Sequence, residues 1–285
     1  MIQRVGVVSK PGRKDIPKLL NFLEGWCRER SVELVVDCIT AEYLRRADGV
    51  RRKDLPAGCD LVVVLGGDGT LLSAARGVGD RRIPLLAVNL GGLGFMMTTG
   101  PHELPSALDR VERSSYELDS RMVLEARLER KGGDIERFFA LNDIVVSHGG
   151  IARVLRLDAY ADEEYVGRYT ADGLILSTPT GSTAYSLAAG GPVMPPGVEA
   201  ICLTPICPHT LSNRSVVLPA SAAVEIRVSG GEEDRNLSVD GQVGRHLGPE
   251  DRIRAWRAGH TVDIVHTKSV PYFDMLRSKL RWGAR

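Results

Sequence analysis

A buried strand that runs directly into a glycine turn constrains this chain more than any other feature. The apolar residues 61–65 are followed by Gly66-Gly67-Asp68-Gly69-Thr70, and an apparent helix opens near Thr70. Glycine permits backbone conformations closed to other residues, and a helix N-terminus presents unpaired N–H groups and a positive dipole end. The pattern predicts a strand–turn–helix unit that binds phosphate through Gly66, Gly67, Gly69 and Thr70.

The one acid within this turn, Asp68, needs a chemical reason, because its charge opposes that of a phosphate. A general base or a metal partner at a phosphoryl-transfer centre would supply that reason. The alternative is structural, since an aspartate just before a helix commonly caps it. Two familiar nucleotide loops are excluded: the turn lacks the third glycine of the dinucleotide fingerprint, and no Gly-x4-Gly-Lys-Ser/Thr occurs in the sequence.

The N-terminal part of the chain alternates between strand and helix patterns. Strands are predicted over 4–8, 32–36, 61–65 and 83–89, and helices over 16–30 and 71–76. Near-continuous β-branched runs indicate strands covered on both faces, as in a doubly wound parallel sheet that binds ligands at the carboxyl ends of its strands. The turn Gly91-Gly92-Leu93-Gly94-Phe95 also follows a strand. Both turns are therefore expected to share one crevice, with a simple tight turn as the alternative for the second.

From about residue 120 the apolar pattern changes to period two. Alternation over 121–130, 153–160, 223–228 and 261–265 predicts an antiparallel all-β second domain. The tail from Pro271 has apolar residues at helical spacing, which predicts a helix packed on the first domain, with a basic membrane-surface helix as the alternative. The predicted division is an α/β domain over 1–118, a β-rich domain over 119–265 and a returning C-terminal segment over 266–285.

Composition limits the partners and the location of the protein. The 37 basic and 36 acidic residues give a formal charge of +1, which provides no electrostatic footprint for nucleic acid or an anionic membrane. The chain opens straight into a strand without a signal segment, and no apolar run reaches the length of a membrane span, so a cytoplasmic protein is expected.

The five cysteines argue against a disulfide framework, because their number is odd and they are scattered. A zinc site at Cys202, Cys207 and His209 is disfavoured, since a fourth ligand at finger or ribbon spacing is missing. Small buried thiols are expected instead.

Three polar motifs stand out in the predicted β domain. Asn142-Asp143 lies inside an apolar strand over 138–146, where both side chains need partners. A hydroxyl- and glycine-rich turn over 177–186 offers N–H, hydroxyl and aromatic groups to a nucleotide, or alternatively carries a hydroxyl that caps the next helix. Asp240-Gly241-Gln242 follows a predicted strand. An aspartate at this position can form a simple Asp-Gly hairpin turn or contact a ligand, and both interpretations remain open.

Over nearly its whole length the sequence resembles the NAD kinases, which phosphorylate the 2′-hydroxyl of the adenosine ribose of NAD. The glycine motif alone is shared with diacylglycerol and sphingoid lipid kinases and, loosely, with 6-phosphofructokinases, whereas the full set in this order is specific. The set comprises Gly66-Gly-Asp-Gly-Thr70, Asn89-x-Gly-x-Leu-Gly94-Phe95, Asn142-Asp143, Asp172-Gly-x4-Thr-Pro-Thr-Gly-Ser-Thr-Ala-Tyr185, Gly190-Gly-Pro192, Pro205-Ile-Cys-Pro-His209 through Arg214, and Asp240-Gly-Gln242.

The resemblance implies a role for each matching residue. Asp68 matches the catalytic aspartate beside the ribose hydroxyl, and Phe95 matches the residue near the adenine. Contacts with NAD, some made by a neighbouring subunit, are implied for Gly69, Phe95, Asn142, Asp143, Asp172, Thr183, Ala184, Tyr185, Ala188, Asp240 and Gln242. It also implies Mg²⁺, ATP or polyphosphate as phosphoryl donor, and a homodimer or homotetramer.

Three positions depart from the pattern of many relatives. Ala188 stands where many have serine, so one hydroxyl contact is absent or replaced. Asp143 stands where others have glutamate, and Ser215 where many have proline.

The chemistry agrees with these residues. A ribose hydroxyl is a poor nucleophile, so a carboxylate that accepts its proton is useful. No lysine takes the role of the P-loop lysine, which predicts catalysis mainly by positioning, with the metal held largely by phosphate oxygens and water. A lipid kinase is one alternative, although it would need an apolar pocket where this chain has the polar turn at 177–186. A non-catalytic NAD-binding regulator is the other, and it would be favoured if Asp68 were missing.

Overall fold

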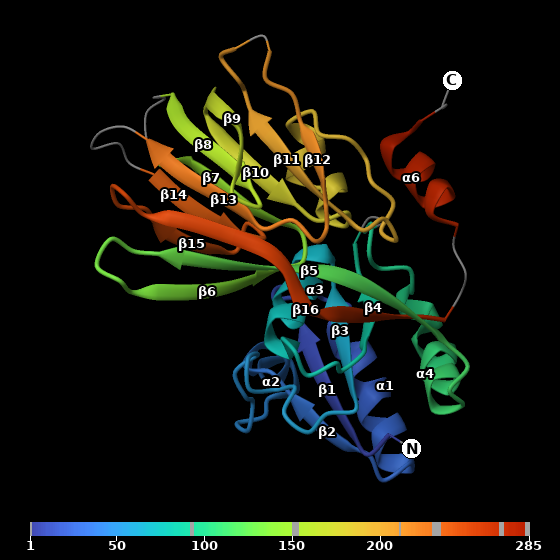
Figure 1. The fold of residues 1–285 in the computed structure, drawn as a ribbon. Helices are drawn as coiled ribbons and strands as arrows, with labels where there is room; N and C mark the ends of the chain where they lie inside the picture. Colours follow the sequence, from blue (N-terminus) through green and yellow to red (C-terminus); the bar gives the residue numbers. More distant parts are fainter. Residues whose placement is uncertain are drawn as a thin grey trace. The chain divides into compact units, whose positions relative to one another are not determined.

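The computed structural model describes residues 2–91, 94–149, 154–210, 212–229, 235–267 and 271–282. The chain divides into two compact units (Figure 1): unit 1 is Met1–Ser120 with Val262–Arg285, and unit 2 is Arg121–Thr261. The C-terminal residues therefore belong to the same unit as the N-terminal ones.

Unit 1 is built around a parallel sheet. Its strands pair in the order β2-β1-β3-β4, and each of these pairings is parallel. Residue Ile264, near the end of β16 (Arg252–His266), runs parallel to Leu85 of β4. The elements of unit 1 are β1 (Arg4–Ser9), α1 (Ile16–Glu29), β2 (Glu33–Val36), α2 (Cys38–Leu44), β3 (Leu61–Gly66), α3 (Asp68–Val78), β4 (Leu85–Asn89), the short helix η1 (Pro101–Glu103), α4 (Leu104–Glu112) and α6 (Tyr272–Leu280).

Both faces of this sheet are covered. Leu20 of α1 and Leu104 of α4 are fully buried in one cluster with Val63 of β3. The strand residues that point the other way, such as Val62 and Val64, are buried as well. This explains the continuous apolar runs of the strands and confirms the predicted doubly wound parallel sheet. Because β3 and β4 are parallel neighbours, the turns that follow them lie at the same edge.

Unit 2 consists of two antiparallel sheets. One has the order β12-β11-β10-β7-β14-β15, and the other joins β5, β6, β8, β9, β13 and the first part of β16. The strands are β5 (Glu117–Glu129), β6 (Ile135–Ala140), β7 (Asp143–His148), β8 (Leu155–Ala161), β9 (Glu164–Ala171), β10 (Gly173–Ser177), β11 (Ala200–Ile206), β12 (Val216–Pro219), β13 (Val224–Ser229), β14 (Arg235–Val239) and β15 (Val243–His246), with the short helices η2 (Gly181–Thr183) and α5 (Tyr185–Ala188).

The two sheets of unit 2 share one core. Ile144 and Leu176 of the first sheet and Leu157 and Ile226 of the second belong to a single buried cluster. Alternate side chains of each sheet thus point inward, which is the arrangement that the period-two pattern predicts. The predicted antiparallel all-β domain is confirmed.

The predicted continuous strand over 138–146 is wrong. β6 ends at Ala140, β7 begins at Asp143, and a bend separates the two strands. At this break the Asp240 carboxylate accepts hydrogen bonds from the N–H groups of Leu141, Asn142 and Asp143. A side chain, rather than a neighbouring strand, therefore satisfies these backbone donors.

The five cysteines are all free thiols. Cys27, Cys59 and Cys202 are buried, as predicted, whereas Cys38 and Cys207 are exposed, contrary to expectation. Cys38 is the first residue of α2 and Cys207 follows the end of β11 with a positive φ of 43°. Both lie at element ends, where the apolar pattern no longer directs side chains inward.

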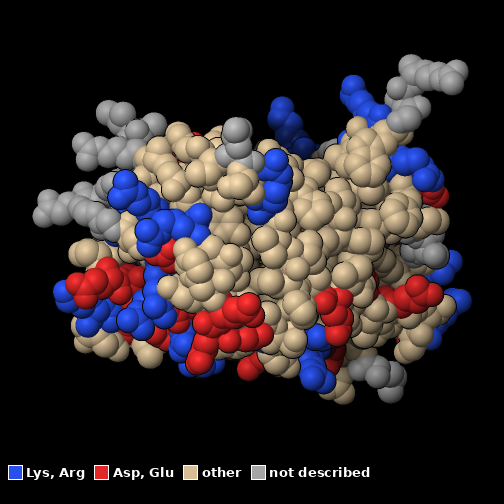
Figure 2. All heavy atoms as spheres, turned by 45° about the horizontal axis from the view of Figure 1, so that its top comes forward, with Lys and Arg blue, Asp and Glu red and all other residues tan. Residues whose placement is uncertain are grey.

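Basic and acidic side chains lie next to one another on the face drawn in Figure 2. This mixture agrees with the formal charge of +1. Among the described residues, no helix is long and apolar enough to cross a membrane.

Candidate active site

Asp68 lies in the first turn of α3, directly after β3. Gly67 is the N-cap residue, with an extended backbone (φ −133°, ψ −175°), and no side chain caps this helix. The Asp68 carboxylate instead accepts a hydrogen bond from the Phe95 N–H through Oδ2, at 3.0 Å. Its Oδ1 is buried and has no hydrogen-bond partner among the described residues. The helix-cap alternative is therefore wrong, and one carboxylate oxygen stays available to accept a proton.

Two glycines of this region allow close contacts that a side chain would prevent. A Cβ at Gly66 would lie 2.3 Å from the Thr70 Oγ1, and a Cβ at Gly94 would lie 2.1 Å from the Asp68 Oδ1. The two glycine turns thus meet at Asp68, which confirms their predicted proximity; residues 92 and 93 lie outside the described part of the chain.

Gly67 is different, because a Cβ there would meet no atom within 4 Å. Gly69, in the first turn of α3, is exposed. The N-terminus of α3 therefore leaves room for a phosphate to approach the main chain at Gly67.

A lysine that the sequence analysis missed lies beside the same residues. Lys279 of α6 holds its Nζ 4.5 Å from the centre of the Phe95 ring. Burial lowers the pKa of Lys279, and the charge of the nearby Asp68 carboxylate opposes this shift. The sequence pattern predicts a basic helix at this end of the chain. It contains no signal that would place one particular lysine next to Asp68.

In unit 2, Asp240 holds the Asn142–Asp143 pair in place. Its carboxylate accepts the N–H groups of Leu141, Asn142 and Asp143 at 3.2, 2.7 and 3.2 Å, and its own N–H donates to the Asp143 carbonyl at 2.9 Å. Asp240 is 7% exposed and Asp143 is 5% exposed. Burial, together with the neighbouring charge of Asp240, raises the pKa of Asp143 to about 7. Asp143 therefore changes charge near neutral pH.

The hydroxyl-rich turn packs against this pair. The Thr178 N–H donates to the Asn142 carbonyl at 2.9 Å, and the Thr178 Oγ1 donates to the Leu141 carbonyl at 2.6 Å. A Cβ at Gly181 would lie 2.0 Å from the Asn142 carbonyl oxygen. Thr178 and Gly181 therefore fix the backbone beside Asn142 rather than facing solvent.

The hydroxyls of the next residues bond within the turn. The Ser182 Oγ donates to the Pro179 carbonyl at 2.6 Å, and the Thr183 Oγ1 donates to the Thr180 carbonyl at 3.1 Å. Neither caps α5, whose N-cap residue is Ala184 without a side-chain hydrogen bond. The proposed helix-capping role for these hydroxyls is therefore wrong.

The exposed side of this turn carries other predicted contact residues. Tyr185 opens α5 and is 47% exposed, and Ala188 at the end of α5 is exposed as well. The Ala184 N–H donates to the Gly181 carbonyl at 2.9 Å, so this peptide group is used within the turn.

Two predicted residues lie next to strands of the same sheet. Asp172 precedes β10, and its Oδ1 is 3.4 Å from the Nε2 of His209. Gln242 is exposed and donates its N–H to the Val239 carbonyl at 3.0 Å, in the turn between β14 and β15.

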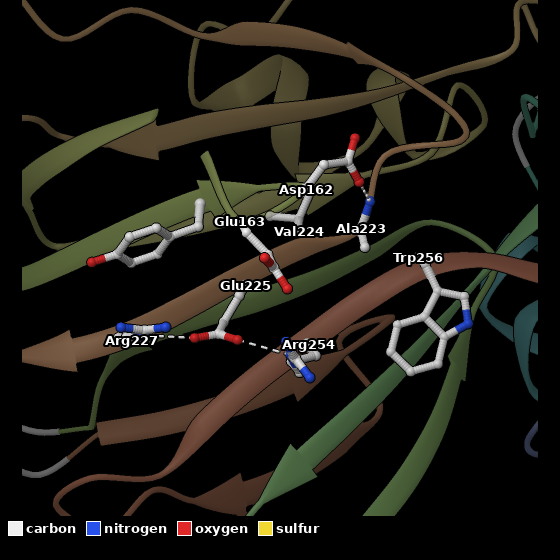
Figure 3. A pocket seen from close by; sticks show the side chains of 9 residues that line it. Asp162, Glu163, Ala223, Val224, Glu225, Arg227, Arg254 and Trp256 are labelled. Carbon is white, nitrogen blue, oxygen red and sulfur yellow. Dashed lines mark hydrogen bonds and ion pairs between the residues drawn. The ribbon is translucent and has the colours of Figure 1, made fainter. Parts of the chain in front are cut away.

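A cavity of about 650 Å³ in unit 2 contains none of the predicted site residues (Figure 3). The Glu225 carboxylate lies between Arg227 and Arg254 and pairs with both. The Arg227 guanidinium also stacks over the Tyr160 ring at 4.4 Å. Because three carboxylates, Asp162, Glu163 and Glu225, line this cavity against two guanidinium groups, it is a poor candidate for the phosphate site.

The fold and the site define a class of protein: an α/β domain joined to an antiparallel β domain, with a carboxylate between two glycines at the carboxyl end of a buried strand. Two family models match the chain, the ATP-NAD kinase N-terminal domain over residues 5–116 and the ATP-NAD kinase C-terminal domain over residues 141–267.

Full-length relatives belong to the same family as these two models. The NAD kinase of Solibacter usitatus is 44% identical over 285 residues, which cover 100% of this chain and 99% of that protein. The NAD kinase of Geotalea daltonii is 44% identical over 284 residues, with 100% of both chains covered.

Solved structures give the same answer for the fold. A yeast NADH kinase complexed with NADH has a TM-score of 0.91 and 30% identity, covering 100% of this chain and 89% of that one. An NAD kinase from Archaeoglobus fulgidus in complex with ATP has a TM-score of 0.77 and 24% identity, covering 98% and 99%. The chain belongs to the NAD kinase family, which confirms the resemblance in its motifs.

Proposed function

We propose that this chain transfers the γ-phosphoryl group of ATP to the 2′-hydroxyl of the adenosine ribose of NAD, giving NADP and ADP. The observation that carries the proposal is the Asp68 carboxylate. One of its oxygens is fixed by the Phe95 N–H at 3.0 Å, and the other is buried without a partner among the described residues.

In this mechanism Asp68 acts as the general base. Its Oδ1 accepts the proton of the 2′-hydroxyl while the ribose oxygen bonds to the γ-phosphorus and the bond to the β-phosphate oxygen breaks. The hydrogen bond from Phe95 to Oδ2 prevents the carboxylate from rotating away. The main chain at Gly67 and Gly69, at the N-terminus of α3, binds the donor phosphates, together with Gly66 and Thr70, which shape the turn.

The remaining contacts with NAD in this proposal are those that the family resemblance implies. Asn142 and Asp143 bind the adenine and ribose groups, with their backbone held by Asp240. Further contacts with NAD come from the hydroxyl-rich turn and its neighbours, namely Asp172, Thr183, Ala184, Tyr185, Ala188 and Gln242. Asp240 is 7% exposed, and its carboxylate accepts hydrogen bonds from main-chain N–H groups. We therefore assign Asp240 mainly to positioning the Asn142–Asp143 pair.

Mg²⁺ is the proposed metal. Among the described residues no group of three or more His, Cys, Asp and Glu side chains could hold a metal ion, and the one buried carboxylate oxygen without a partner among them is Oδ1 of Asp68. This scarcity of carboxylates fits Mg²⁺, which keeps several waters and binds substrate phosphates rather than a cage of protein ligands. When bound, the ion would be held largely by phosphate oxygens and water and would neutralise charge on the donor phosphates, while Oδ1 of Asp68 stays free for the ribose proton.

A cytoplasmic homodimer or homotetramer is also part of the proposal. Five free thiols suit a reducing compartment. The half-exposed ring of Tyr185 suits a residue that helps build a neighbouring subunit's NAD site.

The test is to incubate the purified protein with NAD, Mg²⁺ and either ATP or polyphosphate, and to detect NADP. The proposal expects NADP with at least one of these donors. A lipid kinase would instead phosphorylate diacylglycerol in parallel reactions, and a regulator would bind NAD without turnover. Either result would overturn the assignment.

A further inference from the structure

Lys279 lies at the candidate base although it comes from the opposite end of the chain. Its Nζ is 4.5 Å from the centre of the Phe95 ring, and the main-chain N–H of Phe95 is bonded to the Asp68 carboxylate. Lys279 is half-buried and forms no ion pair with any residue that the structure describes. The charge that acts on its ammonium group is that of the Asp68 carboxylate, the proposed base.

The helix presents this lysine in a defined way. Leu276, three residues before Lys279, is 1% exposed, so both side chains lie on the same side of α6. The other basic residue in the last turn, Arg277, is on the exposed side and pairs with Asp274. Of these two cations, only Lys279 contacts the ring of Phe95.

The chemistry of the site calls for a cation at this place. Negative charge spreads over the oxygens of a phosphoryl group during transfer, and enzymes that use a P-loop place a lysine there. The glycine turn of this chain contains no lysine between Leu61 and Arg76. A cation held in a partly buried position stabilises such charge more than one in bulk water does.

We propose that Lys279 is a catalytic residue whose ammonium group contacts the phosphoryl group as it passes from ATP to the ribose hydroxyl beside Asp68. This inference rests on the proposed function. Lys279 stays protonated throughout: the proton of the hydroxyl goes to Asp68, the new bond joins the ribose oxygen to the γ-phosphorus, and the electron pair of the broken bond leaves with ADP.

The test compares Lys279→Ala, Lys279→Arg and the control Arg277→Ala with the wild-type protein. Removing the ammonium should lower kcat by about 10²–10³, the effect of losing one preorganised group that stabilises transition-state charge. The dissociation constant of NAD, measured by calorimetry, should change by less than about threefold. The kcat of Lys279→Arg should be at least about tenfold higher than that of Lys279→Ala, because arginine restores the positive charge. Arg277→Ala should match the wild type.

Chemical rescue separates catalysis from helix packing. Methylammonium added to Lys279→Ala should restore kcat in a saturable manner, which a helix that has merely moved away would not allow. The proposal is overturned if Lys279→Ala keeps kcat within about threefold of wild type. It is equally overturned if neither arginine nor methylammonium restores activity. Failure of the wild-type protein itself to form NADP would reject the proposed function instead, so the two failures are distinguishable.

Discussion

Asp68 and Asp143 differ in how readily their carboxylates take up or hold a proton, because their surroundings differ. Asp68 has one oxygen bonded to the Phe95 N–H and one without a partner in the described structure, as a general base requires. Asp143 is 5% exposed and lies beside Asp240, so burial and a like charge both raise its pKa, to about 7. In the proposed mechanism the first accepts a proton from the substrate. The second holds its own proton into the neutral range.

The raised pKa of Asp143 predicts a pH-dependent stability. Between pH of about 4 and about 7 the folded state binds more protons at this residue than the unfolded state, so stability is lost as the pH rises. Relative to Asp143→Asn, the wild-type free energy of unfolding should fall across this window, by at most about 4 kcal/mol. Urea unfolding at pH 5 and pH 8 measures the effect.

A matched control is Asp134→Asn, in the exposed turn between β5 and β6. This variant should follow the wild-type pH dependence. If the stability of Asp143→Asn changes with pH in the same way as that of the wild type, then ionising Asp143 costs the folded state little. The claim that burial raises the pKa of Asp143 would then be wrong.

At the scale of elements, the hydrophobic period predicted most of the secondary structure. The helix predicted over 16–30 is α1, Ile16–Glu29, and the four predicted N-terminal strands are β1 to β4. The prediction failed at 138–146, where the apolar residues on either side of Asn142-Asp143 suggested one continuous strand. Asp240, which is distant in the sequence, accepts the main-chain N–H groups at this break, and no local pattern contains that contact.

The same limit applies to the candidate site. The motifs placed Asp68 in a glycine turn between a strand and a helix that opens near Thr70, whereas in the structure the helix begins at Asp68 itself, directly after β3. The contacts of Asp68 with Gly94 and the Phe95 N–H depend on how the two turns pack, and the approach of Lys279 to Phe95 depends on where α6 lies. Residue type and spacing predict the elements that carry such groups, whereas the distances between them follow from tertiary structure.

The hydrogen bonds at the break between β6 and β7 predict that Asp240 anchors the main chain there rather than binding NAD directly. Asp240→Asn weakens the acceptor of three main-chain N–H groups, so it should lower stability by about 1–3 kcal/mol and raise the KM for NAD more than it lowers kcat. Urea unfolding and steady-state kinetics measure both. Weakened NAD binding at unchanged stability would instead make Asp240 a direct ligand of NAD, and no change in either would reject the anchoring role.

At the scale of the whole molecule, the shared-site hypothesis makes a prediction about assembly. If Tyr185 completes the NAD site of a neighbouring subunit, Asp68→Asn and Tyr185→Ala subunits should be nearly inactive alone and partly active when mixed. Some sites of the mixed oligomer then receive both intact residues. NADP formation is followed after subunit exchange, which mass spectrometry verifies. A mixture that stays as inactive as its parents shows that each chain completes its own site.

The most direct test of the account follows the labelled γ-phosphoryl group of ATP in single turnovers of wild type and Asp68→Asn with NAD and Mg²⁺. Label should appear at the 2′-position of NADP, located by phosphorus NMR. Asp68→Asn should keep NAD affinity and slow this transfer by about 10²–10⁴, because the amide cannot act as the base. Label released as inorganic phosphate, or an Asp68→Asn rate within about threefold of wild type, would contradict the assignment of Asp68 as the base of an NAD kinase.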